Sequence, residues 1–426
     1  MAAAPAASIS IKPPLDMTLR LKLSVMMFLQ FAIWGAWFVI LGNYLKGLDP
    51  QKFTDGVIGG IYGTMALGTI FSPLIVGQIA DRFFASEKLM AVLHFAGAGL
   101  LYWMGHIHEP TTFYFVSLVY ALVYSPTLAL SNSIAFAHVP DGNRDFPGLR
   151  VLGTVGWIVV NWIVGLLLTF KTSANTPVVP NAPFLLGSAC SLALGAFSLV
   201  LPHTPPPGKA GDAFPFLKAI GLLKDFSFAV FFGVSFVITI VLAFYYGFTG
   251  LYLEKGVHLS VESITPVMTI GQFAELLLLP FLPWFLKRWG MKWVLAFGML
   301  CWGIRYGLFS IYAQADAVAL YPLVLIGIAL HGICFDFFFA AGFIHVDNKA
   351  PADIRGSGQA LFTFLTYGVG MWLGNMVSGQ LADFLTNPST KAVDWGMFWM
   401  LPAIGVLICF AVFIVFFRDS QRKAEV

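Results

Sequence analysis

Long apolar stretches recur along this chain, and they constrain its fold more than any other feature. A helix that crosses a bilayer needs roughly 20 mostly apolar residues, and the chain offers such stretches in succession, separated by short polar segments. Only 11% of the residues are charged and 58% are hydrophobic, whereas soluble domains carry about 25% charged residues. Because so little charge cannot enclose so apolar a core in water, lipid must solvate much of the surface. We therefore predict an all-α membrane protein.

Twelve spanning helices are expected, six in each half of the chain. Their predicted ranges are 20–47, 56–80, 88–107, 111–139, 147–170, 181–201, 227–253, 262–286, 291–312, 318–347, 356–384 and 392–418. The longest non-spanning segment lies between the sixth and seventh helices and is polar and rich in proline. The predicted organisation begins with a disordered cytoplasmic tail (1–19) and a six-helix bundle (20–202). A cytoplasmic linker (203–226), a second six-helix bundle (227–418) and a cytoplasmic tail (419–426) follow.

The distribution of lysine and arginine predicts the orientation. With the N-terminus in the cytoplasm, 18 of the 24 basic residues fall on the cytoplasmic side, five fall on the opposite side, and Arg305 falls inside a helix. Basic residues concentrate in the cytoplasmic segments of membrane proteins, so we expect both termini and the linker in the cytoplasm. The pattern suits an integral plasma membrane protein, and a bacterial inner membrane in particular.

Composition and motifs argue against several functional classes. The net charge is +3 and no lysine-rich block occurs, so we expect no binding to nucleic acid. The four cysteines show no CxxC spacing, so we expect no metal site, no disulfide framework and no cofactor. The motifs HExxH and GxSxG do not occur, which argues against a membrane-embedded enzyme. The short tails leave no room for the signalling domain of a substrate-sensing receptor.

The loop after the second predicted helix carries a motif. It reads SPLIVGQIADRFFASEK and resembles the G-x-x-x-D-R loop of the major facilitator superfamily, whose transporters are built from two six-helix halves. Gly77 would let two helix backbones approach closely. Asp81, followed by Arg82, could pair with a helix N-terminus or a basic side chain of the other bundle. These three residues would then act in gating, and the alternative is an ordinary helix end with solvated charges.

Ionisable side chains within spanning helices are functional candidates, because each costs at least about 2.5–3.5 kcal/mol in the membrane. Three lie near the middle of predicted helices, namely Glu275, Arg305 and Asp336. Glu275 and Asp336 could carry a proton or contact the substrate, since a carboxylate in an apolar cavity can take up and release a proton. Arg305 is expected to be a structural counter-ion that neutralises one of the two carboxylates.

Helical spacing groups further polar residues. Arg150, Thr154 and Trp157 lie at positions i, i+4 and i+7 and share one helix face. Gln272 lies three residues before Glu275, so these two also share a face. Both faces could line a cavity and contact a substrate.

Four more residues are candidates for substrate contact: Gln30 in the first predicted helix, Tyr246 in the seventh, and His331 and Phe335 in the tenth. The rings of Trp157, Tyr246 and Phe335 could stack on a nucleobase or a sugar, or could face lipid. His331 could titrate or could serve only as a hydrogen-bonding residue.

The chain resembles the nucleoside:proton symporter family of the major facilitator superfamily along nearly its whole length. The stretches that carry the resemblance include LKLSVMMFLQFAIWGAWFVILGNYL, YSPTLALSNSIAF, DFPGLRVLGTVGW, GQFAELLLLPFLPWFLKRWGMKWV, HGICFDFFFAAGFIHV and IRGSGQALF. The resemblance implies a central nucleoside site and import driven by the proton gradient. It also implies that this site includes Arg150, Thr154, Trp157, Gln272, Glu275, Phe335 and Asp336.

The sequence departs from the family pattern at two places. An amide pair on the seventh helix is replaced by Ala243 and Tyr246, and a tyrosine on the tenth helix is replaced by His331. Buried polar groups that match the substrate give a site its specificity. The departures therefore concern which substrate is carried more than how it is carried.

We predict a twelve-helix, two-bundle symporter that imports nucleosides with protons by alternating access. Its expected partners are a small-molecule substrate, protons and the lipid bilayer, and we expect a monomer. The alternative within the same scaffold is a proton-coupled importer of a sugar, a glycoside or a related polyol, because aromatic rings stack on sugars as well.

Overall fold

The computed structural model of the protein describes residues 13–75, 83–173, 176–206, 214–315 and 317–419. The predicted gating residues Gly77, Asp81 and Arg82 lie outside the described residues. The described part is almost entirely helical, and nine of its helical segments are long and apolar enough to cross a membrane. This confirms the predicted all-α membrane protein, whereas the number of twelve spans stays a prediction.

The first half of the chain contributes seven described helices. They are α1 (Met17–Phe38), α2 (Leu41–Leu48), α3 (Asp55–Ile75), α5 (Ser86–Met104), α6 (Pro110–His138), α7 (Gly142–Thr169) and α8 (Ala182–Ser198). Sequence signals mark the first residues of two of these helices. Asp16 caps α1 by accepting a hydrogen bond from the backbone N–H of Leu19 at 3.0 Å, and α6 begins with Pro110, which lacks the N–H that a first helical position leaves unpaired.

The second half follows a short 3₁₀ helix, η2 (Pro215–Lys224). Its helices are α9 (Phe226–Lys255), α10 (Val261–Leu278), α11 (Leu282–Trp289), α12 (Met291–Ala315), α13 (Tyr321–Ala329), α14 (His331–Cys334), α15 (Ala341–Lys349), α16 (Arg355–Thr363), α17 (Met371–Phe384) and α18 (Trp395–Phe416). Two π-helical segments, η5 (Phe335–Ala340) and η7 (Phe364–Gly370), interrupt otherwise continuous helices. Such π segments often occur at functional sites.

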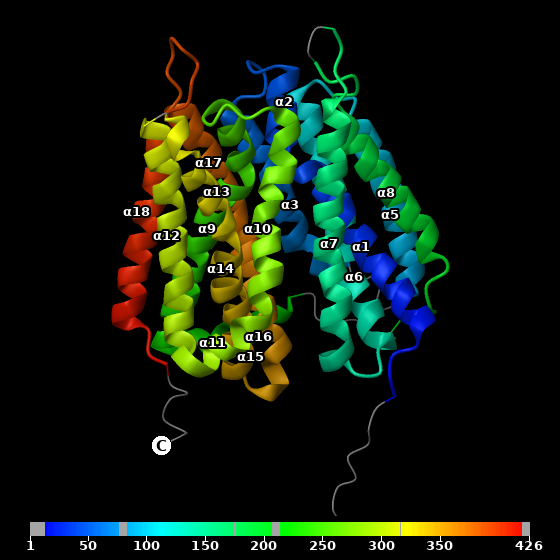
Figure 1. The fold of residues 1–426 in the computed structure, drawn as a ribbon. Helices are drawn as coiled ribbons and strands as arrows, with labels where there is room; N and C mark the ends of the chain where they lie inside the picture. Colours follow the sequence, from blue (N-terminus) through cyan, green and yellow to red (C-terminus); the bar gives the residue numbers. More distant parts are fainter. Residues whose placement is uncertain (1–12, 76–82, 174–175, 207–213, 316, 420–426) are drawn as a thin grey trace, which may run out of the picture.

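The two halves stand side by side as two groups of helices (Figure 1). Within the first half α1 packs along α7, α3 along α6 and α5 along α8, and within the second half α12 packs along α18. Between the halves α3 packs on α17 and α7 packs on α10. The start of α1 and the end of α18 lie at the same end of the molecule, which we name the terminal end (Figure 1). The opposite end, where α2 lies, is the distal end.

Hydrogen bonds hold the two halves together towards the distal end. The Nδ2 group of Asn43 donates to the Gly250 carbonyl at 3.0 Å and to the Glu254 carboxylate at 2.7 Å. Lys171, which follows α7, pairs with Glu262 at the start of α10 at 3.0 Å. Among the described residues, the hydrogen bonds and ion pairs that join the halves all belong to this distal part.

The N-terminus of α3 is capped by a carboxylate from the other half. Asp383 of α17 accepts hydrogen bonds from the backbone N–H groups of Asp55 and Gly56, both at 2.8 Å. A negative charge at a helix N-terminus interacts favourably with the helix dipole. Further along the same contact, a Cβ atom on Gly59 would lie 2.3 Å from the carbonyl oxygen of Asn375, so α3 and α17 approach this closely only because position 59 has no side chain.

Candidate functional site

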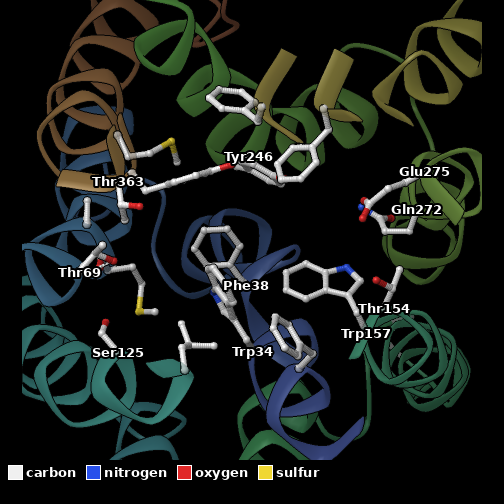
Figure 2. A pocket seen from close by; sticks show the side chains of 18 of the residues that line it. Trp34, Phe38, Thr69, Ser125, Thr154, Trp157, Tyr246, Gln272, Glu275 and Thr363 are labelled. Carbon is white, nitrogen blue, oxygen red and sulfur yellow. Dashed lines mark hydrogen bonds between the residues drawn. The ribbon is translucent and has the colours of Figure 1, made fainter. Parts of the chain in front are cut away.

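A central cavity of about 600 Å³ lies between the two halves. Side chains of α1, α3, α6 and α7 line it from the first half, and side chains of α9, α10, α14, η5, α15, α16, η7 and α17 line it from the second half (Figure 2). Most of the predicted site residues lie in this lining. They are Arg150, Thr154, Trp157, Tyr246, Gln272, Glu275, His331 and Phe335.

The first polar part of the cavity is built from α7 and α10. Arg150, Thr154 and Trp157 reach it from α7 at the predicted helical spacing. Gln272 and Glu275 reach it from α10, on the same side as Thr154 and Trp157 (Figure 2). We name these five residues the first lobe. The charges of Arg150 and Glu275 act on each other, but the two groups form no ion pair within the described residues.

The polar side chains of the first lobe keep their hydrogen-bonding groups available. Within the described part of the chain, no hydrogen bond to the protein is made by the side chains of Arg150, Thr154, Gln272 or Glu275, and Arg150 instead lies with its guanidinium 4.0 Å from the centre of the Phe31 ring. A guanidinium, a hydroxyl, an amide and a carboxylate together offer several donors and acceptors. A ligand that carries both kinds of group could use them.

Aromatic rings form the wall beside these polar groups. The ring of Trp34 lies 5.7 Å from that of Trp157 and 5.4 Å from that of Phe38, in edge-to-face arrangements. Tyr246 lies 6.1 Å from Phe38, and Phe335 lines the cavity from the second half. Such rings can stack on a flat ligand. The structure therefore brings the predicted aromatic residues Trp157, Tyr246 and Phe335 to one cavity.

His331, which lines the cavity, and Arg305, which does not, belong to one stack of side chains with Tyr245. The His331 ring lies parallel to the Tyr245 ring with 5.1 Å between the centres, and its Nε2 lies 3.5 Å from the Tyr246 hydroxyl. Arg305 also packs on the Tyr245 ring, with its guanidinium 3.5 Å from the ring centre. Its Nε donates to the Gly327 carbonyl at 3.0 Å. Arg305 thus differs from the predicted counter-ion, because a ring face and a carbonyl oxygen, and no described carboxylate, contact its charge.

Asp336 and Gln30 are buried behind the cavity and do not line it. Asp336 lies in η5 and is 1% exposed, and among the described residues its Oδ2 has no hydrogen-bond partner. It is close enough to Glu275 for the two charges to repel each other. The Nε2 group of Gln30 donates to the Thr127 hydroxyl at 2.8 Å, and its Oε1 lies 3.0 Å from His94 Nε2. The Gln30 side chain turns towards α5 and α6 and is not part of the cavity lining, so its predicted contact with a substrate stays a prediction.

Sequence reasoning missed the lining residues that α3 and α17 supply, and Ser125 of α6. Tyr62, Met65 and Thr69 follow one face of α3 at i, i+3 and i+7, and Ser125 and Asn375 face them from α6 and α17. None of these side chains carries a charge, and, unlike Thr154 and Gln272, none lies three or four residues from a charged residue on its own helix. The helical spacing along α3 was the signal that could have found this face.

Comparison with known proteins identifies the family. The sequence model described as "Nucleoside H+ symporter" matches residues 17–422. The chain belongs to this nucleoside:proton symporter family. Among its family relatives, YegT of Escherichia coli (strain K12) is 40% identical over 409 residues, which make up 94% of each chain. The xanthosine permease of the same organism is 32% identical, over 96% of this chain and 98% of the relative.

The structure of the symporter agrees with this assignment. It is similar to the crystal structure of the nucleoside transporter NupG, with a TM-score of 0.83 and 28% identity, over 95% of this chain and 100% of that one. The family resemblance and the major facilitator fold expected from the sequence are confirmed. As a family member the protein is a proton-coupled nucleoside transporter, and the sugar alternative is not favoured. Its relatives and structural neighbours are transporters rather than enzymes.

Proposed function

We propose that this symporter imports nucleosides and binds them in the first lobe of the central cavity. The observation that carries the proposal is the unpaired set of donors and acceptors in the first lobe beside a wall of aromatic rings. A nucleoside combines a flat base with a hydroxylated sugar, so it can use both. Trp157 and Phe335 would stack on the base, while Arg150, Thr154 and Gln272 would hydrogen-bond its polar groups.

Glu275 and Asp336 are proposed to carry the proton. Glu275 lines the cavity, while Asp336 lies behind it in η5 and is sensitive to the charge of Glu275. Keeping two neighbouring carboxylates charged in an apolar site is expensive, so one proton shared between them lowers the cost. A substrate that hydrogen-bonds Glu275 changes which carboxylate best holds this proton. Proton and nucleoside binding would be coupled in this way.

The proposed orientation puts the terminal end in the cytoplasm, and with it both termini. The hydrogen bonds between the halves then close the outer side, and the structure corresponds to a state that faces the cytoplasm. Gly77, Asp81 and Arg82 would act at the cytoplasmic end, where they would hold the halves together in the opposite state. We further propose a monomer in a bacterial inner membrane.

The test uses the purified full chain in proteoliposomes. Labelled uridine or adenosine should enter by counterflow, and a pH gradient that is acidic outside should drive accumulation. The double variant Glu275→Gln, Asp336→Asn should lose this accumulation, whereas Glu109→Gln, which changes a largely exposed carboxylate at the distal end, should not. The proposal fails if no nucleoside competes with the label while sugars do, or if the double variant concentrates nucleoside as well as the parent protein.

A further inference from the structure

The 3₁₀ helix η2, which lies between the two halves along the chain, has three faces of different character. Residues three apart lie above one another in a 3₁₀ helix, so every third residue of η2 belongs to one face. We name the three faces inner, polar and outer. The inner face is Phe216, Ala219 and Leu222, the polar face is Lys218, Gly221 and Lys224, and the outer face is Leu217 and Ile220 together with Phe214 just before the helix.

The inner face packs on the beginning of the helical segment formed by α16, η7 and α17, at the terminal end (Figure 1). The Phe216 ring stacks on the ring of Phe364, the first residue of η7, with 4.2 Å between the ring centres and 10° between the ring planes. Ala219 is completely buried. Leu222 lies against Gly358, because a Cβ atom added there would be 3.7 Å from the Leu222 Cδ1 atom. These contacts fix which way the other two faces of η2 point.

The outer face is apolar and exposed. Phe214, Leu217 and Ile220 are 49%, 54% and 48% exposed. Exposed apolar side chains continue along the chain, since Phe226 at the start of α9 is exposed and its ring lies 6.1 Å from the exposed Phe416 ring at the end of α18. Both α9 and α18 are long and apolar enough to cross a membrane. The outer face therefore adjoins, along the chain, surface that lipid would cover.

The polar face carries positive charge. Lys218 and Lys224 are both exposed, and η2 contains no acidic residue. Asp225, the residue after η2, pairs with Lys349 at 2.8 Å, so a lysine outside η2 already balances its charge. Basic segments of this kind are attracted to anionic lipid.

The depth of η2 in the molecule matches the surface of a bilayer. The segment formed by α16, η7 and α17 has 30 residues, Arg355–Phe384, and is about 45 Å long. Because the hydrocarbon core is about 30 Å thick, about 8 Å of a centred segment extends beyond it at each end. Gly358 lies about 5 Å from the start of the segment and Phe364 about 14 Å. The contacts of η2 thus lie on either side of the boundary between headgroups and acyl chains.

We propose that η2 docks on the surface of the bilayer and binds anionic lipid there. The outer face would enter the boundary of the acyl chains, and the lysines of the polar face would contact the negative headgroups, as in an interfacial helix. In the proposed orientation this is the cytoplasmic leaflet, which is negatively charged. A soluble protein could not reach the acyl chains at this depth, so lipid fits the outer face better. Because the inner face packs on α16 and η7, the bilayer surface would fix the terminal end of this segment.

The first experiment measures contact between η2 and lipid in the full chain, reconstituted into vesicles of phosphatidylcholine and phosphatidylglycerol. The four native cysteines are replaced, and Leu217→Cys carries a fluorophore that lipids with brominated acyl chains quench. The quenching should exceed that of the same label on Gly221→Cys by at least about twofold. Gly221 is the matched control, because it lies on the polar face and a Cβ atom there would meet nothing within 4 Å. Ile220→Cys, on the outer face, should behave as Leu217→Cys does.

Lysine variants test the preference for anionic headgroups. Separate bromination of the two lipids gives the affinity of phosphatidylglycerol relative to phosphatidylcholine at the Leu217 label. This ratio should be about fivefold or more at low salt, the contribution of one lysine at an anionic surface. The double variant Lys218→Gln, Lys224→Gln should bring the ratio to within about twofold of one. Lys391→Gln changes an exposed lysine of a distal loop and should leave it unchanged. The melting temperature of each labelled protein shows whether it is folded.

Three results would overturn the inference. The Leu217 and Ile220 labels are quenched no more than the Gly221 label, which would mean that the outer face meets water or protein. Alternatively, the two lipids bind equally well in the parent protein, or the double lysine variant keeps the preference. None of these results bears on the proposed function, because the measurement uses no nucleoside.

Discussion

Asp383→Ala should shift the symporter away from the state described here, towards one that is open at the distal end. In this state Asp383 accepts two hydrogen bonds from the backbone at the start of α3, across the boundary between the halves. Separation of the halves would break both bonds. The substitution therefore removes an interaction that exists only when the distal end is closed, and it leaves the helices within each half untouched.

The expected size of the shift follows from this geometry. Loss of a capping side chain costs about 0.5–2 kcal/mol, and its charge at the helix N-terminus adds about 0.3–1 kcal/mol. Asp383 is an exposed residue, and solvent weakens such interactions, so we expect a value near 1 kcal/mol. That free energy corresponds to about a fivefold change in the ratio of distal-open to distal-closed protein.

Spin labels on the two halves measure this ratio. Gln51 and Ser389 are exposed and lie in distal loops of different halves. The four native cysteines are replaced, and a cysteine at each of these two positions carries a spin label. Opening of the distal end then appears as a longer distance between the two labels. Asp394→Ala is the matched control, because Asp394 caps α18 within one half by accepting from Met397 N–H at 2.9 Å. An unchanged distance distribution in Asp383→Ala, or an equal shift in Asp394→Ala, would refute the reasoning.

Two further predictions concern packing and pH. Gly59→Ala should slow uridine counterflow severely, because the added Cβ would lie 2.3 Å from the Asn375 carbonyl oxygen and relief of such overpacking costs about 1–3 kcal/mol. Gly60→Ala is the control and should transport normally, because its Cβ meets nothing closer than 4.0 Å. Equal transport rates in the two variants would contradict this prediction. The Lys349 ammonium holds the pKa of Asp225 below its ordinary value. This stabilisation is complete above about pH 3.9 and is lost as the pH falls through the lowered pKa. Asp225→Asn should therefore melt at a lower temperature than the parent at pH 7, with a gap that closes below about pH 4; a gap that persists at low pH would rule this out.

The contacts at the distal end and the predicted motif at the terminal end suggest a common principle of gating. Asp383 caps a helix of the other half in the state described here. Asp81 is predicted to make the same kind of contact at the other end when the molecule is in the opposite state. The two carboxylates would then be engaged alternately, so neither state is held so firmly that transport stops.

Much of this protein could be predicted from single residues and their spacing. The apolar stretches gave an all-helical membrane protein because a bilayer leaves the backbone few other ways to satisfy its hydrogen bonds. The face of Arg150, Thr154 and Trp157, and the position of Glu275, also followed from the sequence. A charged group within a membrane helix is expensive wherever its neighbours lie, so its presence alone signals a role.

Packing between helices decided the rest. Gln30 and Arg305 were recognisable as polar residues in a membrane, but only their neighbours show that Gln30 bonds to Thr127 and that Arg305 lies on the ring of Tyr245. The Asp383 cap joins helices that are far apart in the chain, as α3 and α17 are. Spacing along one helix shows which side chains share a face, whereas what that face meets depends on how the helices pack against one another.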